Sequence, residues 1–348
     1  MTSAVFAIPG DINLPTGGYA YDRRMLALLP ACSVTVRRLQ LPAGYPAPSG
    51  ADLDTTAAAF AGVPASSILL VDGLAYGAMP ADVIDRARAP IVAMVHHPLC
   101  LEAGLSKARQ DELYTLEKAA LAKARRTIAT SRATADTLVQ DFAVPRERIT
   151  VAEPGTERAA RAVAASAAPH LVAVGSIVPR KAFDLLVRAL GRLAHLDWRL
   201  TIAGPTDRSA AATRDLHAAI AATGLAPRVT IAGPLSETQL AALYATADIF
   251  VMSSLYEGYG MVLAEAMARG LPIVCTTGGA AADTVPDAAG LKVAPGDEAA
   301  FADAVGRVLR DTGLRRRMAD AAWAAAQSLP RWEDTAAKIA AVIKEIAP

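Results

Sequence analysis

Two glutamates, Glu257 and Glu265, have the residue type and spacing best suited to chemistry in this sequence. They are separated by seven residues, which begin with a glycine turn at 258–260. The preceding run at 247–252 is short, apolar and partly β-branched, which predicts a buried strand, and the run at 261–264 predicts the first turns of a helix. The layout is therefore strand, glycine turn and helix, with a carboxylate on each side of the turn.

This layout suits a ligand with hydroxyl groups at both ends and a phosphate between them. Backbone N–H groups at the start of a helix lack intrahelical partners and attract anionic oxygens. Glu265 is expected about two turns further along, and a carboxylate can accept hydrogen bonds from two vicinal hydroxyls. A nucleotide-sugar has this form, because the hydroxyls of its sugar and of its ribose flank a diphosphate.

The stretch 257–274, EGYGMVLAEAMARGLPIV, resembles the E-x7-E signature of retaining glycosyltransferases of the GT-B fold, especially family 4. A lone E-x7-E would fit a solvated amphipathic helix, but EGYG before it and GLP after it favour the signature. The resemblance implies that Glu257 contacts the transferred sugar and that Glu265 contacts the ribose hydroxyls. It also implies that sugar and phosphate oxygens are held by the backbone of Gly258, Tyr259, Gly260 and Met261.

A paired-glycine loop, Gly17-Gly18, lies between a predicted strand at 5–8 and a predicted helix at 19–29. Two glycines permit close approach to the backbone, and the following helix start favours anions. In the family that the chain resembles, this loop faces the donor phosphates or the acceptor, although a plain turn would also use two glycines. It is not the G-x-G-x-x-G fingerprint, which argues against a nicotinamide dehydrogenase.

A histidine pair, His96-His97, directly follows the predicted strand at 91–95. Ligands of open parallel sheets bind beyond the carboxyl ends of the strands, so this position favours a functional role over a packed loop histidine. The resemblance implies that one histidine contacts the donor sugar. Alignment on the apolar run favours His96, because His97 stands where many relatives carry aspartate.

A basic loop at 175–184, GSIVPRKAFD, follows the predicted strand at 171–174. It resembles the G-x5-K stretch whose basic residues hold the diphosphate, and Lys181 falls on the family lysine. The arginine that often follows the glycine is Ser176 here, and Arg180 is the residue that could supply the guanidinium. The departing diphosphate accumulates negative charge, which fixed cations stabilise.

Three further segments are assigned lesser roles. Gly278-Gly279 with Asp283 beyond resembles a G-G-x-x-E loop of the family, and predicts a loop contact without a catalytic role. The turn at 154–157 resembles the one that ends the first domain, and is interpreted as structural. The basic helix at 107–126 also carries acidic residues, which favours a solvated helix over weak peripheral contact with an anionic membrane.

Composition excludes several classes of protein. A net charge of +1 argues against a nucleic-acid binder that works through bulk charge, and no run approaches the about 20 apolar residues of a membrane span. The amino-terminal segment resembles a first strand more than a signal peptide. Three well-separated cysteines fit a reducing cytoplasm and no metal site. We therefore expect a cytoplasmic enzyme without a metal or another cofactor.

Strands and helices alternate along the whole chain, which predicts an α/β protein with two Rossmann-like, doubly wound parallel-sheet domains. The expected amino-terminal domain, on the acceptor side, is 1–160, and the expected donor domain is 161–330, with an alanine-rich bridge at 159–168 between the two series. The resemblance to GT-B proteins implies that the domains face each other across a cleft. It also implies that the carboxyl-terminal helix at 331–348 packs back on the first domain.

These residues predict a hexosyltransferase that moves a hexose from a UDP- or GDP-linked sugar to a hydroxyl acceptor with retention. A double displacement would need a carboxylate nucleophile beneath the anomeric carbon and a second carboxyl about 5–5.5 Å from it. Because the resemblance assigns Glu257 and Glu265 to hydroxyls, no second acidic motif is left for that role, and the resemblance implies a front-face reaction, which also suits the motifs better. The expected catalytic residues are His96, Arg180, Lys181 and Glu257. The alternatives are a non-hydrolysing nucleotide-sugar epimerase and a non-catalytic nucleotide-sugar-binding subunit. The sequence names neither the base, nor the hexose, nor the acceptor.

Overall fold

The computed structural model describes residues 2–163 and 168–347, which form two compact units. The first unit is Met1–Gly155 together with Pro330–Pro348, and the second is Thr156–Leu329. The units therefore divide after Gly155, five residues before the expected boundary. Residues 164–167 of the predicted alanine-rich bridge lie outside the described residues.

The first unit is built on a six-stranded parallel sheet in the order β2-β1-β3-β4-β5-β6. Its central strands are apolar and fully buried, as expected for a parallel sheet covered on both faces. The strand order reverses between β1 and β3, so this point is the topological switch point of the sheet. The strands are β1 (Thr2–Pro9), β2 (Val34–Leu41), β3 (Ile68–Asp72), β4 (Ile91–Val95), β5 (Arg126–Ala129) and β6 (Ile149–Val151).

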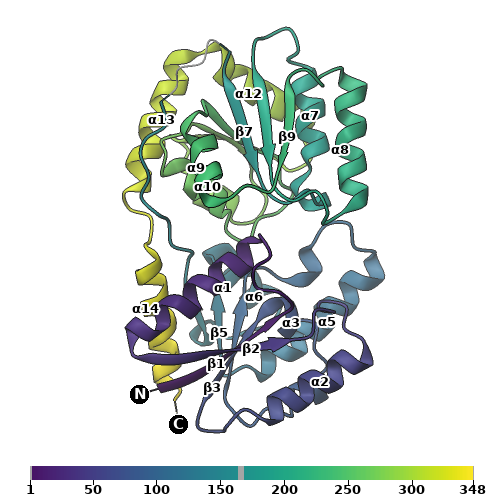
Figure 1. The fold of residues 1–348 in the computed structure, drawn as a ribbon, viewed down its shortest axis with the longest axis vertical. Coiled ribbons are helices and arrows are strands. Elements are labelled where there is room, and N and C mark those ends of the chain that lie inside the picture. The colour runs from purple at the N-terminus through teal and green to yellow at the C-terminus, as the bar shows by residue number, and fades with distance from the viewer. Residues whose placement is uncertain (1, 164–167, 348) are drawn as a thin grey trace. The chain divides into compact units, whose positions relative to one another are not determined.

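Helices cover both faces of this sheet (Figure 1). One core cluster joins alternate residues of the central strands to the apolar sides of α2, α3, α4, α5 and α6. The other face carries α1 and α14. The helices are α1 (Gly17–Leu28), α2 (Gly50–Ala61), α3 (Gly73–Tyr76), α4 (Ala81–Ile84), α5 (Lys107–Lys123), α6 (Arg132–Gln140) and α14 (Trp332–Glu345), with short 3-10 turns η1 (Leu29–Cys32), η2 (Leu99–Leu101) and η3 (Arg146–Arg148).

The carboxyl-terminal helix α14, yellow in Figure 1, packs within the first unit beside α1. The Trp332 ring meets the edge of the Tyr21 ring with centroids 5.6 Å apart. The Thr335 hydroxyl donates to the carbonyl of Glu153 at 2.6 Å. A Cβ at Gly155 would overlap the backbone of Trp332, so the turn at 154–157 needs a glycine where the helix crosses it.

The second unit contains another six-stranded parallel sheet, in the order β12-β11-β10-β7-β8-β9. β10 and β7 lie at its centre, and both are apolar and mostly buried. Together the two sheets confirm the predicted class of two doubly wound α/β domains. The strands are β7 (His170–Val174), β8 (Arg199–Ala203), β9 (Val229–Gly233), β10 (Ile249–Met252), β11 (Ile273–Thr276) and β12 (Gly290–Val293).

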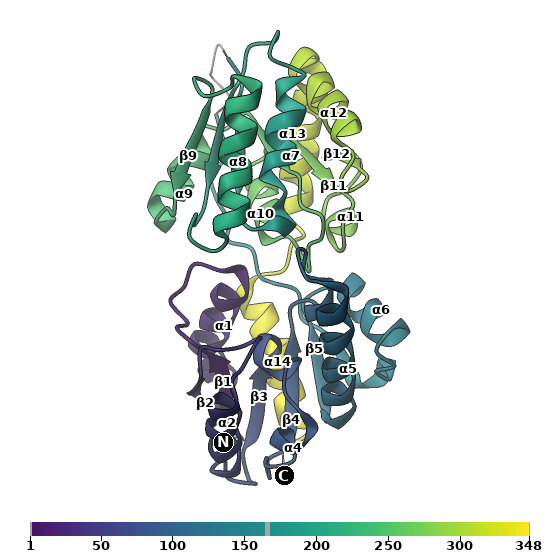
Figure 2. The same cartoon turned by 90° about the vertical axis from the view of Figure 1, so that its right-hand side faces the viewer.

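Two core clusters, one on each face, hold the helices to this sheet. α7, α8 and α12 pack on one face, and α9, α10 and α11 on the other; Figure 2 shows α7 and α8 side by side, and α13 contributes to both clusters. These helices are α7 (Phe183–Gly191), α8 (Ala210–Thr223), α9 (Glu237–Ala245), α10 (Met261–Met267), α11 (Ala281–Thr284), α12 (Glu298–Arg310) and α13 (Thr312–Ala326), with a 3-10 turn η4 (Pro179–Lys181). Among the residues described, no helix is both long and apolar enough to cross a bilayer.

Candidate functional site

The loop that carries Glu257 follows β10 and is fixed by two neighbouring loops. The amide of Leu255 donates to the carbonyl of Arg180 at 2.7 Å. On the other side, the amide of Glu257 donates to the carbonyl of Gly278 at 3.1 Å, and Glu257 forms an isolated parallel bridge with Gly279. The backbone at Glu257 is therefore held from two directions at the carboxyl edge of the second sheet.

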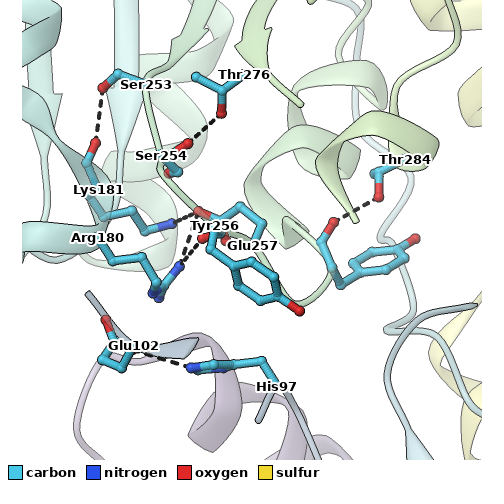
Figure 3. A network of polar contacts seen from close by, with 11 residues as sticks. His97, Glu102, Arg180, Lys181, Ser253, Ser254, Tyr256, Glu257, Thr276 and Thr284 are labelled. Atoms are coloured by element: carbon cyan, nitrogen blue, oxygen red, sulfur yellow. Dashed lines mark hydrogen bonds and ion pairs between the residues drawn. The ribbon is translucent and has the colours of Figure 1, made fainter. Parts of the chain in front are cut away.

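Lys181 and Glu257 form a buried ion pair (Figure 3). Lys181 Nζ lies 2.6 Å from Glu257 Oε1, and the side chains are 11% and 8% exposed. Burial alone would raise the pKa of Glu257, but Lys181 and then Arg180 lower this pKa to about 2. The carboxylate is thus ionised across the whole physiological range, and it orients the lysine.

Arg180 lies beside this pair. Its Nη1 donates to the carbonyl of Tyr256 at 2.7 Å and lies 3.4 Å from Glu257 Oε1 (Figure 3). The Ser253 hydroxyl lies 2.9 Å from the carbonyls of both Lys181 and Ala182, which ties the basic loop to the end of β10. The structure therefore brings both predicted cations of this loop to one carboxylate.

Gly175 explains why the basic motif begins with a glycine. A Cβ there would lie 2.9 Å from Lys181 Cε, and its backbone has φ +156°. The absence of a side chain lets the lysine stem cross the end of β7. Ala182 also adopts the left-handed region at φ +47°, where α7 begins. The sequence places Asp184 near the start of this helix, and the residue occupies the first turn.

The glycine turn leads directly into α10, as predicted. Gly260 adopts φ +86°, which a residue with a side chain rarely does, and Met261 is the first helical residue. The carbonyl of Tyr259 accepts a hydrogen bond from the Thr284 hydroxyl at 2.7 Å (Figure 3). No side chain caps this helix at Gly260. These contacts fix the backbone of 258–261 beside Glu257.

Glu265 lies on α10 and has a fixed orientation. The Tyr244 hydroxyl donates to Glu265 Oε2 at 3.0 Å, and Arg269 lies over the Tyr244 ring at 4.5 Å from its centroid. Burial raises the pKa of Glu265, while the Tyr244 hydrogen bond and Arg269 partly oppose this shift. The expected distance of two turns was wrong: Glu265 is only the fifth residue of α10, because the helix starts at Met261.

The prediction of a loop at Gly17-Gly18 was wrong: both glycines form the first turn of α1, which begins at Gly17, and in the first unit Gly18 lies against the His96 ring. Thr16 caps α1 by accepting from the amide of Tyr19 at 3.3 Å. A Cβ at Gly18 would lie 3.3 Å from His96 Cδ2 and 3.4 Å from Nε2. One role of this glycine is therefore to leave room for the imidazole.

His96 is directed at two buried aspartates. Its Nε2 lies 3.4 Å from Asp22 Oδ1 and 3.3 Å from Asp72 Oδ2. One ligand atom from each of the three lies within 4.8 Å of the others, a spacing that a small ion would also accept, and they are the only such group among the residues described. His97 instead pairs with Glu102, with Nε2 3.3 Å from Oε2 (Figure 3).

Sequence reasoning missed Asp22, Asp72 and Tyr244. Asp72 is the last residue of β3, and its position at a strand end was a usable signal. Asp22 is an isolated acid on α1, and Tyr244 lies on α9, 21 residues before Glu265. No local pattern distinguishes these two residues.

Three of the four basic side chains of α5 have carboxylate partners within the first unit, and the fourth, Lys118, donates to the carbonyl of Asp141. Lys107 pairs with Asp111 at 2.7 Å, and Lys123 pairs with Asp85 at 2.6 Å. Arg126, just beyond the helix, lies 3.1 Å from a carboxylate of α14. This pairing supports the solvated-helix interpretation over contact with an anionic membrane.

Solved structures share the fold of this chain. A sucrose-phosphate synthase from Thermosynechococcus elongatus superimposes with a TM-score of 0.84 at 21% identity, over 99% of both chains. HepE of Anabaena, solved with UDP and glucose, has a TM-score of 0.76 at 18% identity over 99% of this chain and 100% of its own. Two parallel sheets of this kind are the GT-B class of fold.

Family models and curated relatives agree with this class. Residues 168–311 match the model described as glycosyl transferases group 1, and residues 68–159 match glycosyltransferase family 4. A D-inositol 3-phosphate glycosyltransferase of Nocardia farcinica is 33% identical over 67% of this chain and 56% of its own length. An MMP alpha-(1->4)-mannosyltransferase of Mycolicibacterium hassiacum is 28% identical over 74% of this chain and 65% of its own.

The chain belongs to the GT-B glycosyltransferases of family 4, group 1. It spans less than two thirds of the length of both curated relatives, 56% of the Nocardia protein and 65% of the Mycolicibacterium protein.

Proposed function

We propose that this chain transfers a hexose from a nucleoside diphosphate sugar, UDP- or GDP-linked, to a hydroxyl acceptor with retention of configuration. The observation that carries the proposal is the buried cluster of Lys181, Arg180 and Glu257 beside the glycine turn that leads into α10. It combines fixed cations for a diphosphate with a carboxylate for sugar hydroxyls. The names of the relatives, an inositol phosphate glycosyltransferase and a mannosyltransferase, support hexosyl transfer.

In the proposed reaction, the bond between the anomeric carbon and the phosphate oxygen breaks, and the acceptor oxygen bonds to the same face. The acceptor's proton passes to the leaving phosphate oxygen, so no protein nucleophile is required. Lys181 and Arg180 stabilise the charge on the diphosphate. Glu257 and the backbone of 258–261 orient the sugar, and Glu265 accepts from the ribose hydroxyls.

His96 is proposed to contact the transferred sugar, and Gly17-Gly18 to lie near the donor phosphates or the acceptor. The proposal includes no metal, because lysine and arginine supply the positive charge. It also places the protein in the cytoplasm.

Thermal stability with UDP-, GDP- and ADP-sugars, with and without EDTA, tests the proposal. A ligand at 100 times its dissociation constant stabilises the folded state by about 2.7 kcal/mol. We expect a shift with UDP or GDP derivatives that EDTA leaves unchanged and that Glu265→Ala removes.

Product analysis without an acceptor follows, and conversion of the sugar alone would indicate an epimerase. Donor binding with no turnover on any acceptor would indicate a binding subunit, and no shift at all would refute the donor site.

A further inference from the structure

The histidine that follows β4 has an electrostatic environment that sugar contact alone does not explain. His96 Nε2 is fully buried and lies almost equally far from two carboxylates, 3.3 Å from Asp72 and 3.4 Å from Asp22. The two aspartates come from different elements: Asp22 from α1, and Asp72 from the end of β3. Both are essentially inaccessible, at 0% and 1% exposure.

Buried carboxylates need a compensating positive charge, because transfer of an unpaired charge into a protein interior is very costly. Asp72 Oδ1 accepts from the amide of Leu74 at 2.8 Å, whereas neither oxygen of Asp22 has a hydrogen-bond partner of good geometry. Among the residues described, Tyr21 is another titratable group packed on the ring; it meets the ring with centroids 5.4 Å apart and carries no charge near neutral pH. The imidazole, 3.3–3.4 Å from both carboxylates, is therefore placed to supply the positive charge.

We propose that Asp22 and Asp72 are positioning residues that hold His96 as a permanently charged imidazolium at the carboxyl edge of the first sheet. The location supports this, since β3, β4 and α1 meet next to the switch point, where open sheets place their ligands. The tight packing of the Gly18 backbone against Cδ2 and Nε2 fixes the ring in one orientation.

The electrostatic balance agrees with this geometry. Burial alone would lower the pKa of His96, but the contacts with Asp22 and Asp72 raise it to about 10. Burial alone would raise the pKa of Asp72, yet His96 lowers it overall, while burial and the nearby Asp72 charge raise the pKa of Asp22. Asp72 is therefore the main counter-charge of the imidazolium, whereas the raised pKa of Asp22 favours its protonated, neutral form while Asp72 is ionised.

A permanent imidazolium has a chemical consequence, which rests on the proposed function. A protonated His96 cannot accept the proton of the acceptor hydroxyl, so it is a fixed cation and not a general base. The proton then goes to the leaving phosphate oxygen, as the front-face reaction requires. Asp22 and Asp72 act on the reaction only through the charge and orientation of His96.

Histidine NMR measures this charge without any assumption about activity. The chain has five histidines, so protein labelled at histidine Cε1 gives few signals, and His96→Gln identifies the relevant one. We expect the His96 signal to stay at the imidazolium position from pH 6 to 9. In Asp72→Asn, the asparagine side chain can still accept from the amide of Leu74. The substitution should lower the titration midpoint of His96 by about 1–3 pH units. The double variant with Asp22→Asn should lower it further.

Asp111→Asn, which removes an exposed carboxylate of α5, is the matched control and should leave the His96 signal unchanged. Folding of each variant is checked by the signals of the other four histidines. A wild-type midpoint near 6.5, or variants whose His96 does not shift, would overturn the proposal. So would stoichiometric zinc or manganese in the purified protein that Asp22→Asn abolishes, because the cluster would then be a metal site.

The pH profile of kcat separates positioning from a purely structural role. Wild-type kcat should show no transition caused by His96 between pH 6 and 9. In Asp72→Asn, kcat should fall as pH rises through the lowered midpoint, because the imidazole loses its charge. If the NMR signal of His96 shows a permanent charge but no donor is turned over, the proposed hexosyl transfer is refuted and the proposal of a charged His96 is retained. If Asp72→Asn lowers the titration midpoint of His96 but leaves the pH profile of kcat as in wild type, the charge of His96 does not affect the reaction.

Discussion

The Tyr244 hydroxyl donates to Glu265 Oε2 at 3.0 Å, so a fully buried tyrosine of α9 sets the orientation of a carboxylate on α10. Arg269 stacks on the same ring and donates to the carbonyl of Glu265 at 3.0 Å. Only one of the two carboxylate oxygens of Glu265 is fixed by this hydrogen bond. The second carboxylate oxygen, Oε1, is oriented by the same contact but does not accept from Tyr244. This arrangement suits a carboxylate that accepts hydrogen bonds from ligand hydroxyls.

Tyr244→Phe should weaken nucleotide binding while the fold is retained. The substitution removes one hydrogen bond, worth about 0.5–1.5 kcal/mol, from the carboxylate that is proposed to hold the ribose. We expect the Kd for the nucleoside diphosphate to rise by up to about tenfold, measured by calorimetry. Tyr114→Phe, which removes a hydroxyl that donates to the backbone carbonyl of Asp141 in the first unit, is the control and should leave Kd unchanged. Equal affinities for wild type and Tyr244→Phe would contradict the orienting role.

Lys181→Ala should abolish transfer and also destabilise the protein. Loss of one cation that stabilises the diphosphate lowers the rate by about 10²–10³-fold. Loss of one partner of a buried ion pair costs about 3–5 kcal/mol, and Arg180 at 3.4 Å from Glu257 should moderate this cost. Denaturant unfolding and initial rates with a saturating acceptor measure the two effects. Activity within about threefold of wild type would refute the phosphate assignment.

The double variant Lys181→Met with Glu257→Gln distinguishes these two effects. With both charges removed, no carboxylate is left buried without its partner, so much of the lost stability should return. Activity should not return, because the cation and the sugar-binding carboxylate are both missing. Lys123→Ala, which breaks a more exposed pair with Asp85, should leave both stability and activity nearly unchanged.

The sequence predicted the parts of this site that depend on local order along the chain. The strand predicted at 91–95 has its predicted bounds, and those predicted at 171–174 and 247–252 begin within two residues of the observed β7 and β10. The motif residues follow the ends of these strands. Lys181 and Glu257 were both chosen from motifs. Their contact, however, joins residues 76 positions apart and depends on β7 lying beside β10, which no local pattern predicts.

The missed elements and contacts have a common cause in non-local packing. β12 is short, contains Lys292, and lies at the edge of its sheet, so it lacks the apolar run of a central strand. The helix α2 falls in an alanine-rich stretch without a strong apolar period. The cluster around His96 exists because the strand order places β3 between β1 and β4, which brings Asp72 to the histidine.

Glu117 should make the stability of the first unit depend on pH. This carboxyl is buried on α5, where Oε2 accepts from the amide of Leu99 at 2.8 Å, and burial raises its pKa to about 8. The folded state therefore binds its proton more tightly than the unfolded state, whose glutamate has a pKa of about 4.3. The contribution of this group to stability must then fall as pH rises from about 4.3 to 8, and stay constant above that.

Glu117→Gln tests this dependence, because the amide is neutral at every pH and its oxygen can still accept from Leu99. Relative to wild type, the variant should gain stability between pH 5 and 8, by at most a few kcal/mol, since a tenfold change in proton affinity corresponds to about 1.36 kcal/mol. Urea unfolding at pH 5, 7 and 9 measures the difference. Glu112→Gln, on the exposed side of the same helix, is the control. Its difference in stability from wild type should not show the gain between pH 5 and 8 expected for Glu117→Gln. Parallel curves for wild type and Glu117→Gln would show that folding does not raise the pKa of Glu117.

Gly279→Ala should impair the site by displacing Glu257. Gly279 has φ +62°, and an added Cβ would overlap the carbonyl oxygen of Glu257, which accepts from the amide of Ala280 at 2.8 Å. The loop at 278–280 therefore cannot stay in place beside the glutamate once a side chain is present. Gly296→Ala is a matched control, since its φ of +81° is equally unfavourable for alanine but nothing lies within 4 Å of the new Cβ.

Both substitutions introduce the same kind of backbone strain, at about 1–3 kcal/mol, so any additional loss in Gly279→Ala reports the close approach to Glu257. We expect Gly296→Ala to keep wild-type donor affinity with slightly lower stability. Gly279→Ala should lose at least about tenfold in kcat/KM, because misplacement of a positioning carboxylate by about 1 Å lowers the rate strongly. Thermal unfolding, donor calorimetry and initial rates compare the two variants. If Gly279→Ala and Gly296→Ala had identical kinetics, the loop at 278–280 would accommodate the added side chain without moving Glu257. Gly278 and Gly279 would then be needed only for the conformation of the turn.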